Sequence, residues 1–282
     1  MAASKGGSAT KRSVLPIELI KAGGEVLFGE VEGILTQAVG QYALPPDLRD
    51  PDLSWLAKGG KRSLELVKSF RPIGVLHHAS NLLGGVLHNW IGTEIALEDA
   101  LFGNRERTDC LMAVWALSQI EQRGLSQKLG VLTIFYDVCN FFCSITHETL
   151  EKDLRDSAAS EPLIALSALL HQDVAYTMRV GKVQKLLRMH AGVIQGGRAS
   201  PAEASVVTNR RVQELHAQRP ASRTIRVRYE DPESGGSRDV VANDVSFVDD
   251  CAYATAKPAD RTVGATTMVC KISITSRSYA LG

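Results

Sequence analysis

The sequence predicts an α+β protein, because helical and strand-like patterns both occur along its 282 residues. Residues 15 to 43 repeat apolar side chains at helical spacing, whereas Leu129 to Tyr136 is a continuous apolar run of the kind found in a central strand. Short apolar runs stand on both sides of Phe247 to Asp250 and indicate a hairpin. These three observations predict helices and a sheet in one chain.

The N-terminal region is predicted to begin with helices. Gly23-Gly24 interrupts the helical pattern of residues 15 to 43, and Pro45-Pro46 ends it. Residues 46 to 70 lack a periodic pattern, so we expect them to be irregular, with a basic glycine turn that includes Lys58.

Two further helices are expected before the central strand. Ser80 or Asn81 can cap a helix that runs to about Ile95. Thr108 can cap the next helix, and Gly124 is expected to end it.

The second half of the chain alternates helix and strand patterns. Ser200, Pro201 and Glu203 stand at the N-cap, N1 and N3 positions of a capping box, so a helix is expected to follow to about His216. The other expected elements are helices from Thr146 and over 163–170, a hairpin of strands 174–180 and 183–189 around Gly181, and strands 224–229 and 239–247.

The composition is that of an ordinary globular protein, with 44% hydrophobic and 22% charged residues. The longest apolar run, Val131 to Phe142, is too short to span a membrane and contains Asp137. Residues 1 to 12 are basic and lack the apolar core of a signal peptide, so we expect a flexible tail. Five cysteines without C-x-x-C spacing suggest reduced thiols. Together these features predict an intracellular protein, in the cytoplasm or nucleus.

Charge is distributed unevenly, although the formal net charge is only +1. Between Tyr176 and Tyr229 there are eleven Lys and Arg residues against Glu203 and Glu214, which gives +9 for that stretch (11 − 2). Such a block fits a polyanionic partner such as nucleic acid. The alternative is a solvated face whose charge is balanced elsewhere in the fold.

Adjacent carboxylates at Asp249 and Asp250 are the most informative pair in the chain. At the end of a hairpin they repel each other and lose hydration, which calls for a compensating charge. Hard oxygen ligands suit Mg²⁺, whereas an Asp-Asp turn exposed to water would need no metal. Asp137 ends the central strand and supplies a third carboxylate. A nucleotidyl-transfer site of this kind uses two metal ions roughly 3.5–4 Å apart.

The order of motifs resembles that of reverse transcriptases, most closely those of non-LTR retrotransposons. The first aspartate motif is matched by Tyr136 to Ile145, the glutamine-glycine…serine-proline motif by Gly192 to Pro201, and the aromatic-x-Asp-Asp motif by Phe247 to Asp250. Upstream, Phe70 to Ile73 and Phe102 to Arg105 resemble two further segments of the family. The resemblance covers roughly residues 15 to 256.

This resemblance implies an RNA-directed DNA polymerase that adds dNTPs to a primer 3′-hydroxyl on an RNA template. Asp137 and Asp249 would be the principal ligands of Mg²⁺, or Mn²⁺, and Asp250 would support them. RNA-dependent RNA polymerases resemble the pattern too, but they usually carry a second aspartate near position 142 and glycine before Asp-Asp. Phe142 and Val248 therefore favour the reverse transcriptase.

Five residues would contact the incoming nucleotide. Phe142 would occupy the steric-gate position against a ribose 2′-hydroxyl. Gln195 with Gly196 would contact the sugar. Arg71, together with Lys58, would contact the triphosphate. Pro72 disfavours a helical conformation for Arg71 and so predicts an extended segment there.

The fold implied is a right hand of fingers and palm, whose palm is an antiparallel sheet backed by helices. The expected regions are a flexible tail (1–12), fingers and connecting helices (13–128), the palm (129–256) and an atypical tail (257–282). The family pattern stops after the Asp-Asp hairpin, so we expect a C-terminally truncated chain without a thumb. The alternative is an inactive retroelement relic that at most binds RNA through residues 176 to 229.

Overall fold

A computed structural model describes residues 17–59, 65–66, 69–105, 108–219, 225–230, 237–241, 244–247, 250–258 and 267–275. The expected tail 1–12 and Asp249 lie outside these residues. The chain divides into two compact units, each built from two stretches of sequence. Unit 1 comprises Met1–Ala96 and Phe142–Ala204, and unit 2 comprises Leu97–Phe141 and Ser205–Gly282.

Unit 1 begins with two helices, α1 (Ile17–Ala22) and α2 (Gly24–Gly40). The break expected at Gly23-Gly24 is confirmed, and Gly24 has a positive φ of +56° that favours glycine. The prediction of an irregular segment over residues 46 to 70 is wrong. That segment contains α3 (Pro46–Arg49) and β1 (Asp52–Ala57), and β1 is stabilised by a strand partner that local sequence does not reveal.

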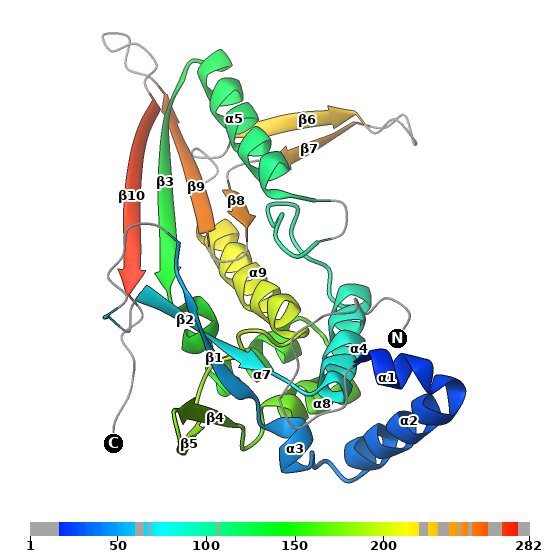
Figure 1. Cartoon of the computed structure of the whole chain (residues 1–282). Coiled ribbons are helices and arrows are strands. Elements are labelled where there is room, and N and C mark those ends of the chain that lie inside the picture. The colour runs from blue at the N-terminus through cyan, green and yellow to red at the C-terminus, as the bar shows by residue number, and fades with distance from the viewer. Residues whose placement is uncertain are drawn as a thin grey trace. The chain divides into compact units, whose positions relative to one another are not determined.

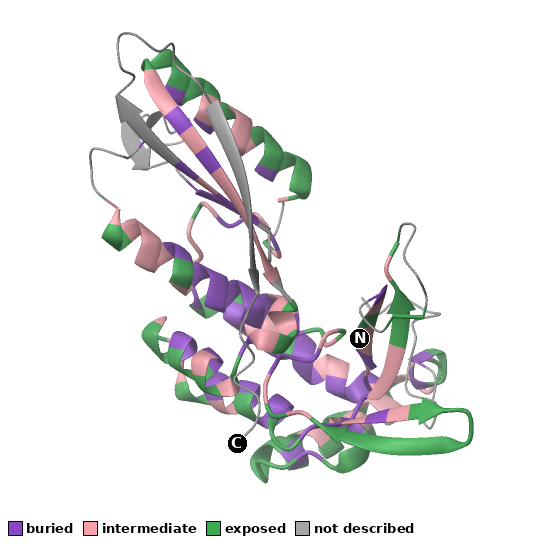
Figure 2. Cartoon of the chain, turned by 90° about the vertical axis from the view of Figure 1, so that its left-hand side faces the viewer, coloured by how far each residue is buried: buried purple, intermediate pink, exposed green. Residues whose placement is uncertain are grey.

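The sheet of unit 1 has the order β2-β1-β4-β5. β1 pairs antiparallel with β2 (Phe70–Val75), which confirms the extended segment, and contacts β4 (Ala175–Val180) through a parallel pairing at Asp52 and Thr177. β4 and β5 (Val183–Arg188) form the expected hairpin, in which Gly181 has a φ of +59°. Figure 2 shows β5 exposed along its length.

Three helices complete unit 1: α4 (His78–Glu94), α7 (His147–Asp156) and α8 (Glu161–His171). Leu87, Leu154 and Leu163 are fully buried among them. Thr146 caps α7 as expected, because its side chain accepts a hydrogen bond from Thr149 N at 3.1 Å. The predicted cap of α4 is wrong: His77 Nδ1 accepts from Ala79 N, and the Ser80 hydroxyl donates to the carbonyl of Leu48 instead.

Unit 2 contains a four-stranded sheet in the order β10-β3-β9-β8 (Figure 1). Its strands are β3 (Leu129–Cys139), β8 (Asp244–Phe247), β9 (Asp250–Pro258) and β10 (Thr267–Thr275). β3 lies inside the sheet, which confirms the predicted central strand. The expectation of an antiparallel sheet holds for β3, β9 and β8, but β10 runs parallel to β3. This strand was not predicted, although Val269, Ile272 and Ile274 are residue types typical of strands.

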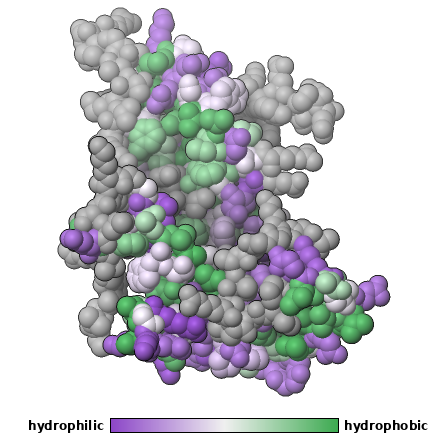
Figure 3. All heavy atoms as spheres, in the orientation of Figure 1, coloured by the Kyte–Doolittle hydropathy of each residue, from purple (hydrophilic) through white to green (hydrophobic). Residues whose placement is uncertain are grey.

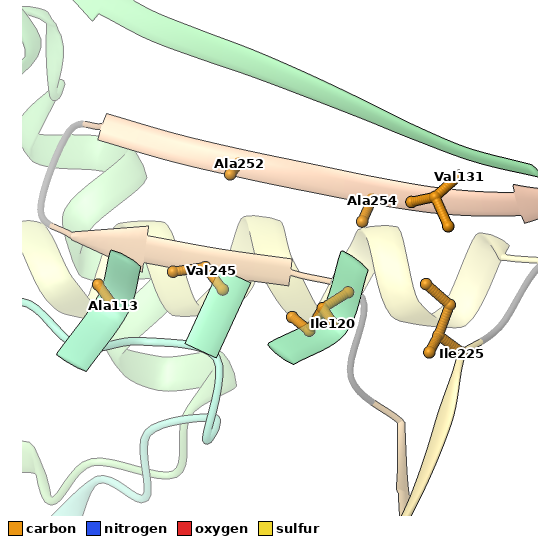
Figure 4. Packing of buried hydrophobic residues seen from close by; sticks show 7 residues of the cluster. All are labelled: Ala113, Ile120, Val131, Ile225, Val245, Ala252 and Ala254. Carbon is orange, nitrogen blue, oxygen red and sulfur yellow. The ribbon is translucent and has the colours of Figure 1, made fainter. Parts of the chain in front are cut away.

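Helix α5 (Cys110–Ser126) covers one face of this sheet. Figure 4 shows the shared core, which consists of Ala113, Ile120, Val131, Ile225, Val245, Ala252 and Ala254. Gly124 was expected to end the helix, but α5 continues to Ser126. A Cβ at Gly124 would lie 2.3 Å from a methyl carbon of Val131, so glycine allows the helix to approach β3 closely.

The N-terminus of α5 differs from the prediction by one residue. Asp109, not Thr108, is the N-cap, and its carboxylate accepts a hydrogen bond from Met112 N at 2.8 Å. The Thr108 hydroxyl donates to the carbonyl oxygen of Phe102 at 2.5 Å. Both residue types favour the N-cap position, so the sequence alone does not separate them.

The remaining elements of the described chain are α6 (Phe141–Ser144), α9 (Ser200–Gln218), β6 (Arg226–Glu230) and β7 (Ser237–Val241). The boundary between the two units falls within α9. β6 and β7 form a separate antiparallel ribbon, so the strand predicted over 239–247 is divided into β7 and β8. None of the described helices is long and apolar enough to cross a membrane.

Apolar side chains also gather on the surface of each unit (Figure 3). On α5, Leu111 and Trp115 are 77% and 66% exposed. On unit 1, α2 and α4 form an apolar groove lined by Phe28, Leu35 and Val86. A helix with apolar residues on its outer face is typical of a surface that another segment or protein covers.

Candidate functional site

The predicted carboxylates lie at one edge of the sheet in unit 2. In the register of β3 and β9, Asp137 stands directly opposite Asp250, the first residue of β9. Phe247, the last residue of β8, also pairs with Asp250, so the predicted hairpin is confirmed. Asp249 belongs to the two-residue connection between these strands and lies outside the described residues.

Directly opposite residues of an antiparallel pair have Cβ atoms about 4.5–5.5 Å apart. The backbone register therefore brings the positions of Asp137 and Asp250 close together. The sheet positions Asp137 by register alone, because a slip of one residue would move it to the other face.

The surroundings of Asp137 are largely apolar. A cavity beside it is lined by Val114 and Leu117 of α5, by Phe135 of β3 and by Phe247 of β8. Within the described ranges, no three His, Cys, Asp or Glu side chains meet in a metal-binding cluster. The donor set of Asp137, Asp249 and Asp250 consists of hard oxygens, which fits Mg²⁺ or Mn²⁺.

The predicted glutamine-glycine motif forms a tightly held loop in unit 1. Gly192 N donates to the carbonyl of Ile145 at 2.7 Å, and Val193 N donates to the carbonyl of Phe142 at 2.9 Å. Gly192 has a φ of +100°, and a Cβ there would lie 2.9 Å from Cys143 Cα. Glycine is therefore required for the loop to lie against the segment that carries Phe142.

The other end of this loop contacts β2. Gly74 N donates to the backbone carbonyl of Gln195 at 2.7 Å. Gly196 has a φ of +111°, and a Cβ there would lie 2.6 Å from the carbonyl oxygen of Gly74. Gln195 and Gly196 are thus held against the strand that carries Arg71, whose side chain is exposed.

Lys58 and Arg71 lie at the same end of the β1–β2 ladder. Lys58 N donates to the carbonyl of Ser69 at 2.8 Å, while Leu56 pairs with Arg71. Because side chains alternate along a strand, Lys58 and Arg71 are diagonal neighbours on one face. All five predicted nucleotide-contacting positions therefore belong to unit 1, namely Lys58, Arg71, Phe142, Gln195 and Gly196, and the loop contacts β2 at Gly74, three residues from Arg71.

Two groups of charged side chains can be compared among the described residues of the basic block. Arg211 on α9 donates to the carboxylate of Glu214. Arg219 follows the helix, and its side chain is only 1% exposed. It donates to both carboxylate oxygens of Asp244, at 2.7 and 2.9 Å. The charges of Arg211 and Arg219 are therefore compensated by neighbouring carboxylates. The β4–β5 hairpin carries exposed charges at Arg179, Lys182, Lys185 and Arg188, of which Arg179 forms an ion pair with Asp52 at 3.7 Å.

Sequence reasoning missed a buried polar network in unit 1. Glu203, with no exposed surface, accepts hydrogen bonds from Ser167 Oγ at 2.7 Å and from His171 Nε2 at 2.9 Å. The predicted capping box is therefore wrong, because Glu203 turns to α8 and the Ser200 hydroxyl donates to the carbonyl of Ile194 at 2.7 Å. The spacing of Ser167 and His171, four residues apart on one helix, was the available signal.

The network extends to the loop through a second histidine. The rings of His171 and His147 stack with centroids 5.4 Å apart, and His147 Nε2 lies 3.0 Å from the carbonyl oxygen of Gly192. Burial is the main cause that lowers the pKa of His147. The bond to the Gly192 carbonyl and the charge of Glu203 oppose it, His171 lowers the pKa further, and the net direction is downward. The His147 ring is therefore neutral near pH 7.

No protein-family model matches the chain, and no curated protein matches it. Among solved structures, the fold is similar to that of apo telomerase from Candida tropicalis, with 11% identity, a TM-score of 0.50, and coverage of 82% of this chain and 44% of that chain. It is also similar to telomerase from Candida albicans in complex with the TWJ fragment of telomeric RNA, with 12% identity, a TM-score of 0.50, and coverage of 83% and 43%.

The chain thus spans less than half the length of these two telomerase structures. At such identities the likeness concerns the fold. The mixed arrangement of helices around a four-stranded sheet is therefore similar to that of telomerase, which agrees with the α+β fold class expected from the sequence.

Proposed function

We propose that the chain is an RNA-directed DNA polymerase domain of the non-LTR retrotransposon type, which transfers dNTPs to a primer 3′-hydroxyl. The observation that carries the proposal is the register that sets Asp137 opposite Asp250 beside the Asp249 hairpin. The motif order along the sequence and the likeness to telomerase, a reverse transcriptase-related enzyme, support it further.

Asp137, Asp249 and Asp250 would hold Mg²⁺ or Mn²⁺, which supplies activation of the primer hydroxyl and neutralisation of triphosphate charge when bound. The chain's own contribution at this edge is to fix the carboxylates through strand register.

In unit 1, Arg71 and Lys58 would bind the triphosphate, because both lie on one face of a strand ladder and carry hydrogen-bond donors without acceptors. Gln195 would contact the sugar. Phe142 would exclude a 2′-hydroxyl by the size of its ring. The hydrogen bond from Val193 N to the Phe142 carbonyl holds the backbone from which that ring projects. The exposed charges of the β4–β5 hairpin would contact phosphates of the RNA template and DNA primer.

Primer extension on poly(rA)/oligo(dT) tests the proposal. The wild-type protein is expected to incorporate dTTP with Mg²⁺ or Mn²⁺, and Asp249→Ala is expected to abolish incorporation. Absence of synthesis at every protein concentration with either metal would contradict it. Salt-sensitive RNA binding that survives Asp249→Ala, without synthesis by the wild type, would instead identify a relic that only binds RNA. Preference for UTP would identify an RNA polymerase.

A further inference from the structure

The buried network of Glu203, His171 and Ser167 has no part in the proposed chemistry, yet it is costly to maintain. A carboxylate without solvent contact destabilises a fold unless hydrogen bonds compensate it. Here the Ser167 hydroxyl and His171 Nε2 supply those bonds, at 2.7 and 2.9 Å. Because a carboxylate accepts and an imidazole can donate, His171 Nε2 carries a hydrogen.

The orientation of His171 in turn places His147. Since His171 Nε2 is bonded to Glu203, its ring plane is fixed, and the ring of His147 stacks on it at an interplanar angle of 25°. His147 Nε2 lies 3.0 Å from the carbonyl oxygen of Gly192, which can only accept. A neutral His147 ring therefore carries its hydrogen on Nε2 and donates it to the loop.

This bond completes a clamp on the start of the loop. The carbonyls of Ile145 and Phe142 accept from the backbone N–H groups of Gly192 and Val193, and His147 donates to the Gly192 carbonyl. The first two contacts are bonds between backbone groups, so a substitution at position 147 does not remove them directly. The bond from His147 comes from a side chain, so a substitution can remove it and leave the backbone bonds in place.

We propose that His147 is a positioning residue that fixes the Gly192–Gly197 loop, and that Glu203 and His171 orient its ring. The structural part of this inference concerns the order of the loop. Its functional part rests on the proposed polymerase activity, because the loop carries Gln195, which would contact the incoming nucleotide. Loosening the loop should therefore weaken nucleotide binding more than the chemical step.

Three variants separate the hydrogen bond from the packing. His147→Phe keeps a ring to stack on His171 but removes the donor, whereas His147→Gln places an amide donor near the position of Nε2. His190→Phe is the matched control, because His190 is exposed and lies two residues before the loop. If His147→Phe fails to fold, His171→Gln serves instead, because it can still donate to Glu203 but removes the stacked ring.

Amide hydrogen exchange over Gly192–Gly197, measured by mass spectrometry, is the first readout. We expect exchange to accelerate about fivefold in His147→Phe, which is the effect of losing one ordinary hydrogen bond, and to return toward wild type in His147→Gln. The control His190→Phe should leave exchange unchanged. Unchanged exchange in His147→Phe, or equal acceleration in the control, would overturn the inference.

Primer extension is the second readout, and it separates this inference from the proposed function. The KM for dTTP should rise about fivefold in His147→Phe with kcat within twofold of wild type, and His147→Gln should restore the KM. Faster loop exchange with no synthesis even by the wild type would refute the polymerase function but leave the positioning role intact. Faster exchange with an unchanged KM would refute the link between loop order and nucleotide binding.

Discussion

The two units position their candidate residues by different physical means. In unit 1, glycines with positive φ and hydrogen bonds between distant backbone segments hold the loop that carries Gln195. In unit 2, the register of paired strands places Asp137 opposite Asp250. A loop held by close contacts is sensitive to added atoms, whereas a position set by register is sensitive to the pairing of whole strands. Substitutions in each unit should therefore differ in their effects.

The largest structural effect is expected at Gly196. Gly196→Ala would place a Cβ 2.6 Å from the Gly74 carbonyl oxygen at a φ of +111°, so unit 1 should lose at least about 2 kcal/mol of unfolding free energy. Urea unfolding in a Trp115→Phe background measures this, because Trp55 and Trp90 then report on unit 1 alone. Gly181→Ala is the control and should cost less, because its φ of +59° is one that non-glycine residues of this chain also adopt and a Cβ there meets no atom within 4 Å. Equal losses in both variants would show that the close contact is unimportant.

A substitution at Phe142 tests whether this residue of unit 1 selects deoxynucleotides over ribonucleotides. Phe142→Ala should raise incorporation of UTP relative to dTTP by about 10- to 200-fold, the range for changes of size in a binding pocket. The ratio of kcat/KM values for the two nucleotides measures it. Phe141→Ala is the adjacent control and should leave the ratio within about twofold. An unchanged ratio in Phe142→Ala would show that this ring does not act as a gate.

Surface charges of the β4–β5 hairpin should contribute to nucleic-acid affinity in a salt-dependent way. The logarithm of the association constant falls as the logarithm of the salt concentration rises. Replacing Lys182 and Lys185 with Gln should make this fall less steep, by about 0.7–0.9 for each phosphate that the variant no longer neutralises. Binding to an RNA–DNA duplex at several salt concentrations measures the slope. Lys152→Gln is a matched control, because Lys152 pairs with Asp156 on α7. A slope that changes equally in the control would place the nucleic-acid interface elsewhere.

The smallest effect concerns the cap of α5 in unit 2. Asp109→Ala should cost about 1 kcal/mol of unfolding free energy, because Met112 N loses its acceptor. In a Trp55→Phe, Trp90→Phe background, the fluorescence of Trp115 on α5 follows unit 2. If Thr108→Ala destabilised unit 2 and Asp109→Ala did not, Thr108 rather than Asp109 would be the residue that caps the helix.

The sequence was informative where a local pattern decides the structure. The Gly23-Gly24 break, the Thr146 cap, the hairpin around Gly181 and the central strand over Leu129 to Tyr136 are each encoded within a few residues, and each is confirmed. The predicted β8–β9 hairpin also depends on adjacent segments.

The errors occur where distant segments cooperate. β1 pairs with the neighbouring β2 but also with the distant β4, and β10 pairs in parallel with the distant β3; neither strand was predicted. Glu203 fits a capping box by spacing, but a buried bond to His171 of another helix is formed instead. Part of the candidate site was therefore predictable, namely its residue types and order. The hydrogen-bonded support of the loop was not.

Single-nucleotide extension of oligo(dT) on poly(rA) with the wild-type protein and Asp137→Asn tests the central claim most directly. The variant keeps the size of the side chain but removes the charge that would hold Mg²⁺, so we expect dTTP incorporation to fall about a thousandfold. Asp99→Asn, an exposed acidic residue of the same unit, should retain activity within about twofold. Wild-type activity in Asp137→Asn, or no incorporation by the wild type, would contradict the account.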